Sequence, residues 1–178
     1  MRVLILALAA AVALPLSACN KKDDEGPAKV VETPTRKPGL WKQVTTIEGM
    51  GAIPAVSLCL DEASDKKLAW WAQQGLRRNC RENDVTRNAD GSWSFSTICG
   101  SPDGMRTINV GTATGDFQSS YKVVAKHTTT GSPDPRMNGS RNLTIESTWV
   151  GACAANMRPG DLQLPDGGLL NLIEVMGQ

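Results

Sequence analysis

The sequence is poor in the residues on which most catalytic sites depend. It has one histidine, His127, in 178 residues, although histidine is the commonest general base and metal ligand. Lysine and arginine number 19 against 18 aspartates and glutamates, for a net charge of +1. This balance lacks the positive excess of nucleic-acid-binding proteins, so we expect no nucleic-acid partner. Beyond the first 16 residues, the sequence has no apolar run long enough to cross a bilayer.

The N-terminus carries an export signal. Arg2 precedes an apolar run from Val3 to Leu16, which is too short for a transmembrane helix. The following Leu16-Ser17-Ala18-Cys19 resembles the lipobox of bacterial lipoproteins, in which the signal is cleaved before an acylated cysteine. We therefore expect residues 1–18 to be removed and Cys19 to anchor the protein to a membrane. The alternative is an ordinary secretion signal with an incidental cysteine.

This resemblance predicts a location in the bacterial cell envelope, on the periplasmic side. By similarity to lipoprotein sorting, Asn20 in place of aspartate favours the outer membrane. Residues 19–37 are polar and rich in proline and charge, which predicts a solvated tether. Residues 38–178 are then expected to form a single β-rich domain.

The four remaining cysteines indicate disulfides. Cys59, Cys80, Cys99 and Cys153 form an even set with no Cys-x-x-Cys spacing. In an oxidising compartment such a set predicts two disulfides. We expect Cys59–Cys80, which brackets a predicted helix, and Cys99–Cys153, although four cysteines permit three connectivities.

Alternating apolar and polar residues predict a mainly β fold. Turn residues separate the strands at intervals of about ten residues, which is typical of an antiparallel meander. We expect a curved sheet or half-barrel, with one covering helix at 62–76 that begins after Asp61 and a short C-terminal helix within 169–176. Gly115-Asp116 is interpreted as a two-residue hairpin turn. By parity, Cys99 and Cys153 should both point toward the core. The expected strands are 40–47, 55–60, 81–87, 92–99, 106–114, 117–127 and 142–150.

Several of these segments together resemble a known family. They are Arg36 to Trp41, Val56 to Leu60, Cys80, Ser94 to Cys99 and Gly151 to Cys153. The chain is similar over residues 37–153 to the proteobacterial family called domain of unknown function 3617. The resemblance implies a small periplasmic β domain and no catalytic residue, because that family has no established activity. Residues 154–178 form an extension outside the match.

No catalytic constellation can be assembled from the sequence. His127 could act as a base beside a serine and a carboxylate, but no serine lies in a Gly-x-Ser-x-Gly elbow. A structural or solvent-exposed histidine is the favoured interpretation. We expect no enzyme activity, no metal site and no cofactor.

The aromatic residues leave two interpretations open. They can fill the core, or they can line a concave sheet that holds an apolar or lipid-like ligand. The function hypotheses are thus a protein-binding or envelope-structural module, a carrier of apolar ligands, and an enzyme that uses His127. The candidate ligand-lining residues are Trp41, Trp93, Phe95, Tyr121 and Trp149.

Overall fold

The computed structural model describes residues 33–70, 79–101 and 104–176. The predicted signal, Cys19 and most of the predicted tether lie outside the described residues. Among the described residues, no helix has the length and apolarity needed to cross a membrane.

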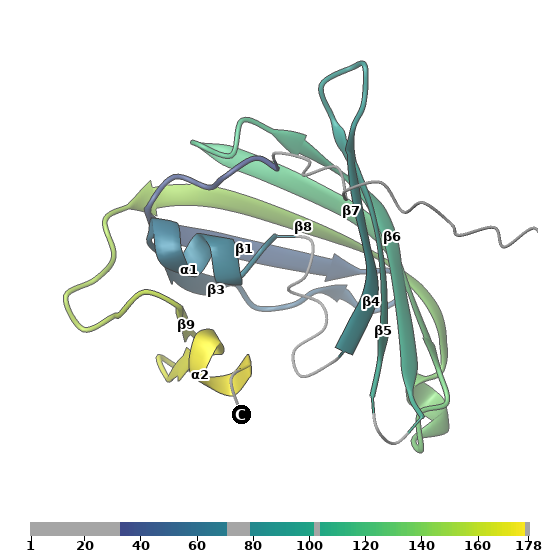
Figure 1. Cartoon of the computed structure of the whole chain (residues 1–178). Helices are drawn as coiled ribbons and strands as arrows, with labels where there is room; N and C mark the ends of the chain where they lie inside the picture. The colour runs from purple at the N-terminus through teal and green to yellow at the C-terminus, as the bar shows by residue number, and fades with distance from the viewer. Residues whose placement is uncertain (1–32, 71–78, 102–103, 177–178) are drawn as a thin grey trace, which may run out of the picture. The chain divides into compact units, whose positions relative to one another are not determined.

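One antiparallel sheet dominates the fold. Its order is β10-β9-β3-β1-β8-β7-β6-β5-β4, with β2 paired to β1. Figure 1 shows that the sheet curves strongly, so that β1 and β3 run nearly at right angles to β4 and β5. The predicted class, a mainly antiparallel and curved sheet, is confirmed. The strands are β1 (Gly39–Ile47), β2 (Gly51–Ala52), β3 (Val56–Leu60), β4 (Asn79–Arg87), β5 (Trp93–Gly100), β6 (Arg106–Gly115), β7 (Ser120–Thr130), β8 (Gly139–Gly151), β9 (Asp161–Gln163) and β10 (Leu169–Asn171).

Within the described residues, three short helical segments accompany the sheet: α1 (Glu62–Lys67), the 3-10 helix η1 (Pro135–Met137) and α2 (Leu172–Met176). Asp61 caps α1 as predicted, since its carboxylate accepts from the Ser64 backbone N–H at 2.7 Å. The helix ends far before residue 76, however, because Leu68 leaves helical geometry and is buried in the core. Residues 71–76, the rest of the expected helix, lie outside the described residues.

Alternation along the strands places the core on one face of the sheet. Along β5, every second residue from Trp93 to Cys99 is buried. Residues paired across strands share a face, and Phe117, Tyr121, Val123 and Ala125 are buried as well. We call this the inner face. Cys99 points toward it as predicted, with 2% of its surface exposed.

The connection between β6 and β7 is longer than predicted. It comprises residues 116–119 rather than the two-residue turn Gly115-Asp116. Asp116 Oδ1 accepts from the backbone N–H groups of Gln118, Ser119 and Ser120 at 2.8–3.1 Å. Within this loop Phe117 adopts a positive φ of 57°. The Asp116 carboxylate thus provides the hydrogen-bond acceptor for three backbone N–H groups of this longer loop.

The predicted disulfide pairing is wrong. The bonds are Cys59–Cys153 and Cys80–Cys99. Five strands separate β3 from β4 in the sheet, so Cys59 does not lie beside Cys80 although the two are close in sequence. Cys80 instead lies directly opposite Cys99 on the neighbouring strand.

The prediction that Cys153 points toward the core is also wrong. The register between β1 and β8 shifts between Leu40 and Trp41, and β8 ends two residues before the cysteine. Cys153 joins Cys59, which is paired with Leu40. Because Trp41 is paired with Leu58, Cys59 belongs to the sheet face opposite the aromatic core.

The C-terminal extension adds two short strands to the sheet. In β9, Leu162 pairs with Leu58 of β3, and β10 forms a hairpin with β9. The short terminal helix expected within 169–176 is present as α2, although residues 169–171 form β10 instead. The extension therefore folds back onto the sheet.

Candidate functional site

Aromatic rings contact one another on the inner face. Tyr121 stacks on Phe117 with ring centroids 5.1 Å apart and meets the Trp41 ring at 5.4 Å. Trp70 then links Phe117, at 5.4 Å, to Phe95, at 5.7 Å. These five rings come from β1, β5, β7 and two connecting segments. Such aromatic contacts contribute to stability beyond their buried area, so they form part of the core.

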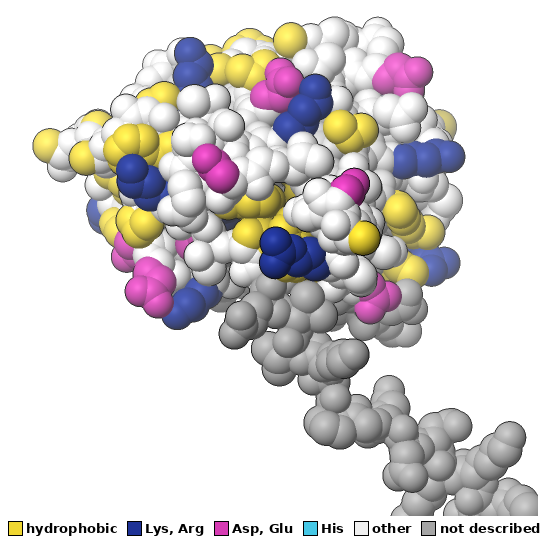
Figure 2. All heavy atoms as spheres, turned by 90° about the horizontal axis from the view of Figure 1, so that it is seen from above, with side chains coloured by type: hydrophobic (Ala, Val, Ile, Leu, Met, Phe, Trp, Pro, Cys, Tyr) yellow, Lys and Arg dark blue, Asp and Glu magenta, His cyan; other side chains and the backbone are white. Residues whose placement is uncertain are grey.

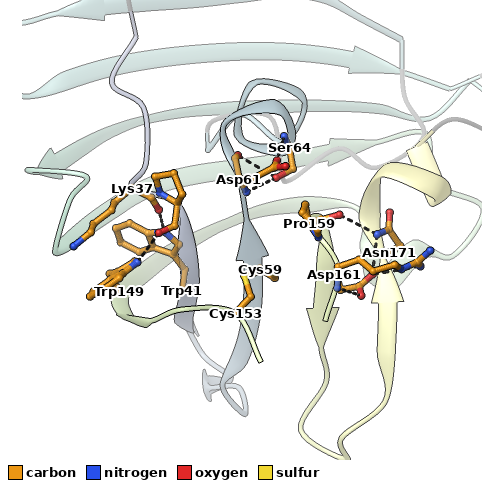
Figure 3. The surroundings of a disulfide bond; sticks show 12 residues. Lys37, Trp41, Cys59, Asp61, Ser64, Trp149, Cys153, Pro159, Asp161 and Asn171 are labelled. Atoms are coloured by element: carbon orange, nitrogen blue, oxygen red, sulfur yellow. Dashed lines mark hydrogen bonds and ion pairs between the residues drawn. A yellow bond between two sulfur atoms is a disulfide. The ribbon is translucent and has the colours of Figure 1, made fainter. Parts of the chain in front are cut away.

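The five candidate ligand-lining residues do not all belong to this ring cluster. Trp41, Phe95 and Tyr121 do, and Trp93 is buried elsewhere in the same core. Trp149 is only partly buried, and its indole N–H donates to the Pro38 carbonyl at 3.0 Å. Lys37 Nζ lies 3.6 Å from the centre of the Trp149 ring, in a cation–π contact. Figure 3 shows Lys37 beside Trp149 and Trp41.

A polar row continues the inner face beyond the aromatic cluster. Thr97, Asn109, His127 and Arg141 lie opposite one another in register on β5, β6, β7 and β8. Asn109 Nδ2 donates to Thr97 Oγ1 at 3.0 Å, and both side chains are almost fully buried. The adjacent row includes Thr107, whose buried hydroxyl has no hydrogen-bond partner among the described residues. The inner face is therefore aromatic at one end and polar at the other.

His127 is held by two described hydrogen bonds within this row. Its Nδ1 lies 2.5 Å from Asn109 Oδ1, and its Nε2 lies 3.0 Å from Thr129 Oγ1. An amide oxygen can only accept, so Nδ1 carries the proton in the first contact. These two contacts orient the ring.

A buried ion pair secures the segment before β1. Arg36 Nε donates to Asp65 Oδ1 of α1 at 2.6 Å, and 2% of Arg36 is exposed. The same guanidinium donates to the Tyr121 hydroxyl at 3.3 Å and to the Leu68 carbonyl. Gln43 also donates to the Tyr121 hydroxyl, at 2.8 Å. This network, which we call the Arg36 network, connects the segment before β1 to α1, β1 and β7.

The folded domain consequently begins earlier than the predicted boundary at Pro38. Lys37 N–H donates to the Phe117 carbonyl at 3.0 Å, and the Gln118 side chain donates to the Thr35 carbonyl at 3.0 Å. The part of the tether nearest to β1 is therefore bound to the domain. Arg36 was expected in the solvated tether because it belongs to a polar segment rich in proline and charge.

A shallow groove lies beside the C-terminal extension. It has a volume of about 420 Å³ and is lined by residues of β10, α2 and the segment before β9. Burial alone would raise the pKa of the Asp161 carboxyl at its edge. Hydrogen bonds from Arg158 N–H and Asn171, with the nearby Arg158 charge, outweigh burial and hold this pKa below its usual range. The charged groups of the groove thus bind one another.

The described residues contain no group of three or more histidine, cysteine, aspartate or glutamate side chains placed to hold a metal ion.

Figure 2 shows acidic and basic side chains interspersed over the face it presents. Two members of the aromatic cluster, Trp70 and Phe117, were not among the candidate ligand-lining residues. Phe117 was expected on the same face as Tyr121, whereas Trp70 lay within the expected helix 62–76, which ends before it.

Comparison with known proteins identifies a family and no activity. No curated protein and no solved structure matches the chain. The family model described as "Protein of unknown function (DUF3617)" matches residues 36–153, from the buried arginine of the Arg36 network to the second cysteine of the Cys59–Cys153 bond. The chain therefore belongs to the DUF3617 family.

Proposed function

We propose that this protein is a lipid-anchored module on the periplasmic side of the bacterial outer membrane, which binds or supports other envelope components without catalysing a reaction. The proposal rests on the pairing of the cysteines. The two disulfides contain Cys59, Cys80, Cys99 and Cys153, so Cys19 in the lipobox-like segment is the cysteine available for acylation. Disulfides of this kind form in oxidising compartments.

The inner face supports a binding or structural role over catalysis. Its aromatic rings contact one another, and its histidine ring is oriented by hydrogen bonds with Asn109 and Thr129. The Arg36 network also holds the end of the tether against the domain. These features suit a rigid domain presented from a membrane.

Metabolic labelling with a radioactive fatty acid tests the anchor. The wild-type protein should incorporate the label and fractionate with outer membranes, whereas Cys19→Ser should be unlabelled. Cys153→Ser is the matched control, because it removes a cysteine of the folded domain and should leave the label in place. Label retained in Cys19→Ser would disprove acylation at this residue.

A second candidate is a carrier of an amphiphilic, lipid-like ligand. The observation in its favour is the division of the inner face into an aromatic end and a polar row that includes Asn109 and His127. An apolar chain and a polar head group would each find a matching surface there. Native mass spectrometry of protein gently extracted from its own membranes discriminates the two roles. A solvent-extractable mass beyond the anchor lipids would support the carrier, and its absence would support the interaction module.

A further inference from the structure

A small pocket lies between the chain segment that precedes β1 and the end of α1. It has a volume of about 130 Å³. Residues 33–35 form one wall, and Lys66, Ala69 and Trp70 form the other, with the buried Asp65 beside them. We call it the α1 pocket. Its size is close to that of an engineered apolar cavity of about 150 Å³ that binds benzene, so it has room for one small apolar group.

The Trp70 ring connects the α1 pocket to the aromatic cluster of the inner face. Trp70 lines the pocket, and only 2% of its surface is exposed. Its ring contacts Phe95, with centroids 5.7 Å apart, and Phe117, at 5.4 Å. An apolar group in the pocket therefore packs against a ring whose position is fixed by two other rings. Large aromatic side chains of this kind line most small-molecule sites.

The charged groups of the α1 pocket already have partners of opposite charge. Asp65 accepts hydrogen bonds from Arg36 Nε at 2.6 Å and from the Arg36 backbone N–H at 3.1 Å. Lys66 Nζ, which is exposed at the rim, lies 2.8 Å from Glu62 Oε1. Because these pairs neutralise the walls, the pocket suits an uncharged group better than a charged one.

The wall formed by residues 33–35 is fixed to the rest of the domain. Gln118 Nε2 donates to the Thr35 carbonyl at 3.0 Å, and the Arg36 network begins at the next residue. These bonds hold the wall in place from outside the pocket. The α1 pocket is therefore formed before any ligand enters, as most small-molecule sites are.

We propose that the α1 pocket binds the end of an acyl chain. This inference rests on the carrier role proposed above and assigns a site to the apolar end of its ligand. The end of an acyl chain is uncharged and narrow, so it fits a neutral pocket of this volume, and the polar head group remains outside at the exposed rim. Removal of its methylene groups from water, against Trp70, drives binding.

Equilibrium dialysis with radioactive decanoate tests the proposal. The protein is the mature chain from residue 19 with Cys19→Ser, so that no covalently attached acyl chain competes for the pocket. It should bind decanoate and should not bind butyrate, which carries the same carboxylate on a chain too short to bury much apolar surface. Equal binding of butyrate would show that the carboxylate is recognised instead of the chain, and would overturn the proposal.

Substitutions at Ala69 test the location of the site. Ala69→Leu places a larger side chain in the α1 pocket and should weaken decanoate binding about tenfold, the equivalent of about two displaced methylene groups. Ala63→Leu is the matched control, because Ala63 is exposed on the same helix and does not line the pocket. It should bind as the parent does. Ala69→Ser, which makes the wall polar with little change in volume, should also weaken binding and serves if Ala69→Leu fails to fold.

The outcomes separate the α1 pocket from the carrier role as a whole. Unchanged binding by the Ala69 variants, or an equal loss in Ala63→Leu, would overturn the pocket as the site and leave the carrier role standing. No binding of decanoate by the parent chain would overturn both. Binding that appears only after Val31→Ser would also overturn the proposal, because the occupant would then be the chain's own Val31, two residues before Thr33 in the wall.

Discussion

Arg36, ahead of β1, and Asp65, in α1, form an ion pair whose two side chains are almost fully buried. We expect Arg36→Ala to lower the free energy of unfolding by about 3–5 kcal/mol, because it leaves the Asp65 carboxylate buried without its charge partner. Urea denaturation measures this loss. Lys66→Ala is the control, since it breaks the exposed Lys66–Glu62 pair of the same helix and should have little effect. Equal effects of the two variants would show that the Arg36 pair is not stabilising.

The two disulfides should differ in their contribution to stability. The Cys59–Cys153 bond closes a sequence separation of 94 residues and the Cys80–Cys99 bond one of 19. In the chain-entropy model these loops correspond to about 5 and about 3 kcal/mol. Cys59→Ala/Cys153→Ala should therefore unfold at lower urea than Cys80→Ala/Cys99→Ala. Peptide mapping without reduction should recover the same two pairs, and a 59–80 linked peptide would contradict the structure.

Asp116 should make stability depend on pH in acid. Hydrogen bonds from the Ser119 hydroxyl and from three backbone N–H groups hold the pKa of Asp116 far below its usual range. A carboxyl with a lowered pKa in the folded state stabilises above its unfolded pKa of about 3.9 and loses this contribution as the pH falls below it.

Thermal unfolding of the wild type and Asp116→Ala between pH 7 and pH 2 checks this effect. The difference in melting temperature should be largest near neutral pH and should shrink below about pH 4. Asp84→Ala, at an exposed position on β4, is the control. A difference that stays constant down to pH 2 would show that ionisation of Asp116 contributes nothing.

Phe117 offers a test that separates ring packing from backbone strain. Truncation to alanine should cost about 3–5 kcal/mol, because the stacked ring is almost fully buried. Its φ of 57° is unfavourable for a side chain with a Cβ but not for glycine. Phe117→Gly should therefore be at least as stable as Phe117→Ala in urea denaturation. A markedly less stable glycine variant would contradict the positive φ.

The strands could be predicted from the sequence, because the alternation of apolar and polar residues that marks a strand involves only residues close together in the chain. Alternation from Trp93 to Cys99 was enough to place β5 and its buried face, and Asp61 was enough to begin α1. The disulfides were not predictable in this way, because they depend on the order of strands in the sheet. Proximity in sequence favoured Cys59–Cys80, whereas hydrogen bonding placed Cys80 opposite Cys99.

The same limit applies to the inner face. Parity assigned Trp41, Phe95 and Tyr121 to one side of their strands, and the structure brings these residues into one core. Parity also placed Phe117 on the face of Tyr121. It could not show that Trp70 completes the aromatic cluster from outside the strands, nor that Thr97, Asn109 and His127 form one row. Those relationships come from cross-strand register, which the amino-acid pattern of a single strand does not contain.

The position of β1 between β3 and β8 has a consequence for the order of folding. Strands β4 to β8 pair with their neighbours in sequence, so their hairpins can form early through local contacts. Trp41, by contrast, pairs with Trp149, more than one hundred residues later in the chain. Contacts of such high contact order slow folding, because a long loop must close before they form. The pairing of β1 with β8 must therefore wait until almost the whole chain has been synthesised, whereas the pairing of β1 with β3 can form early.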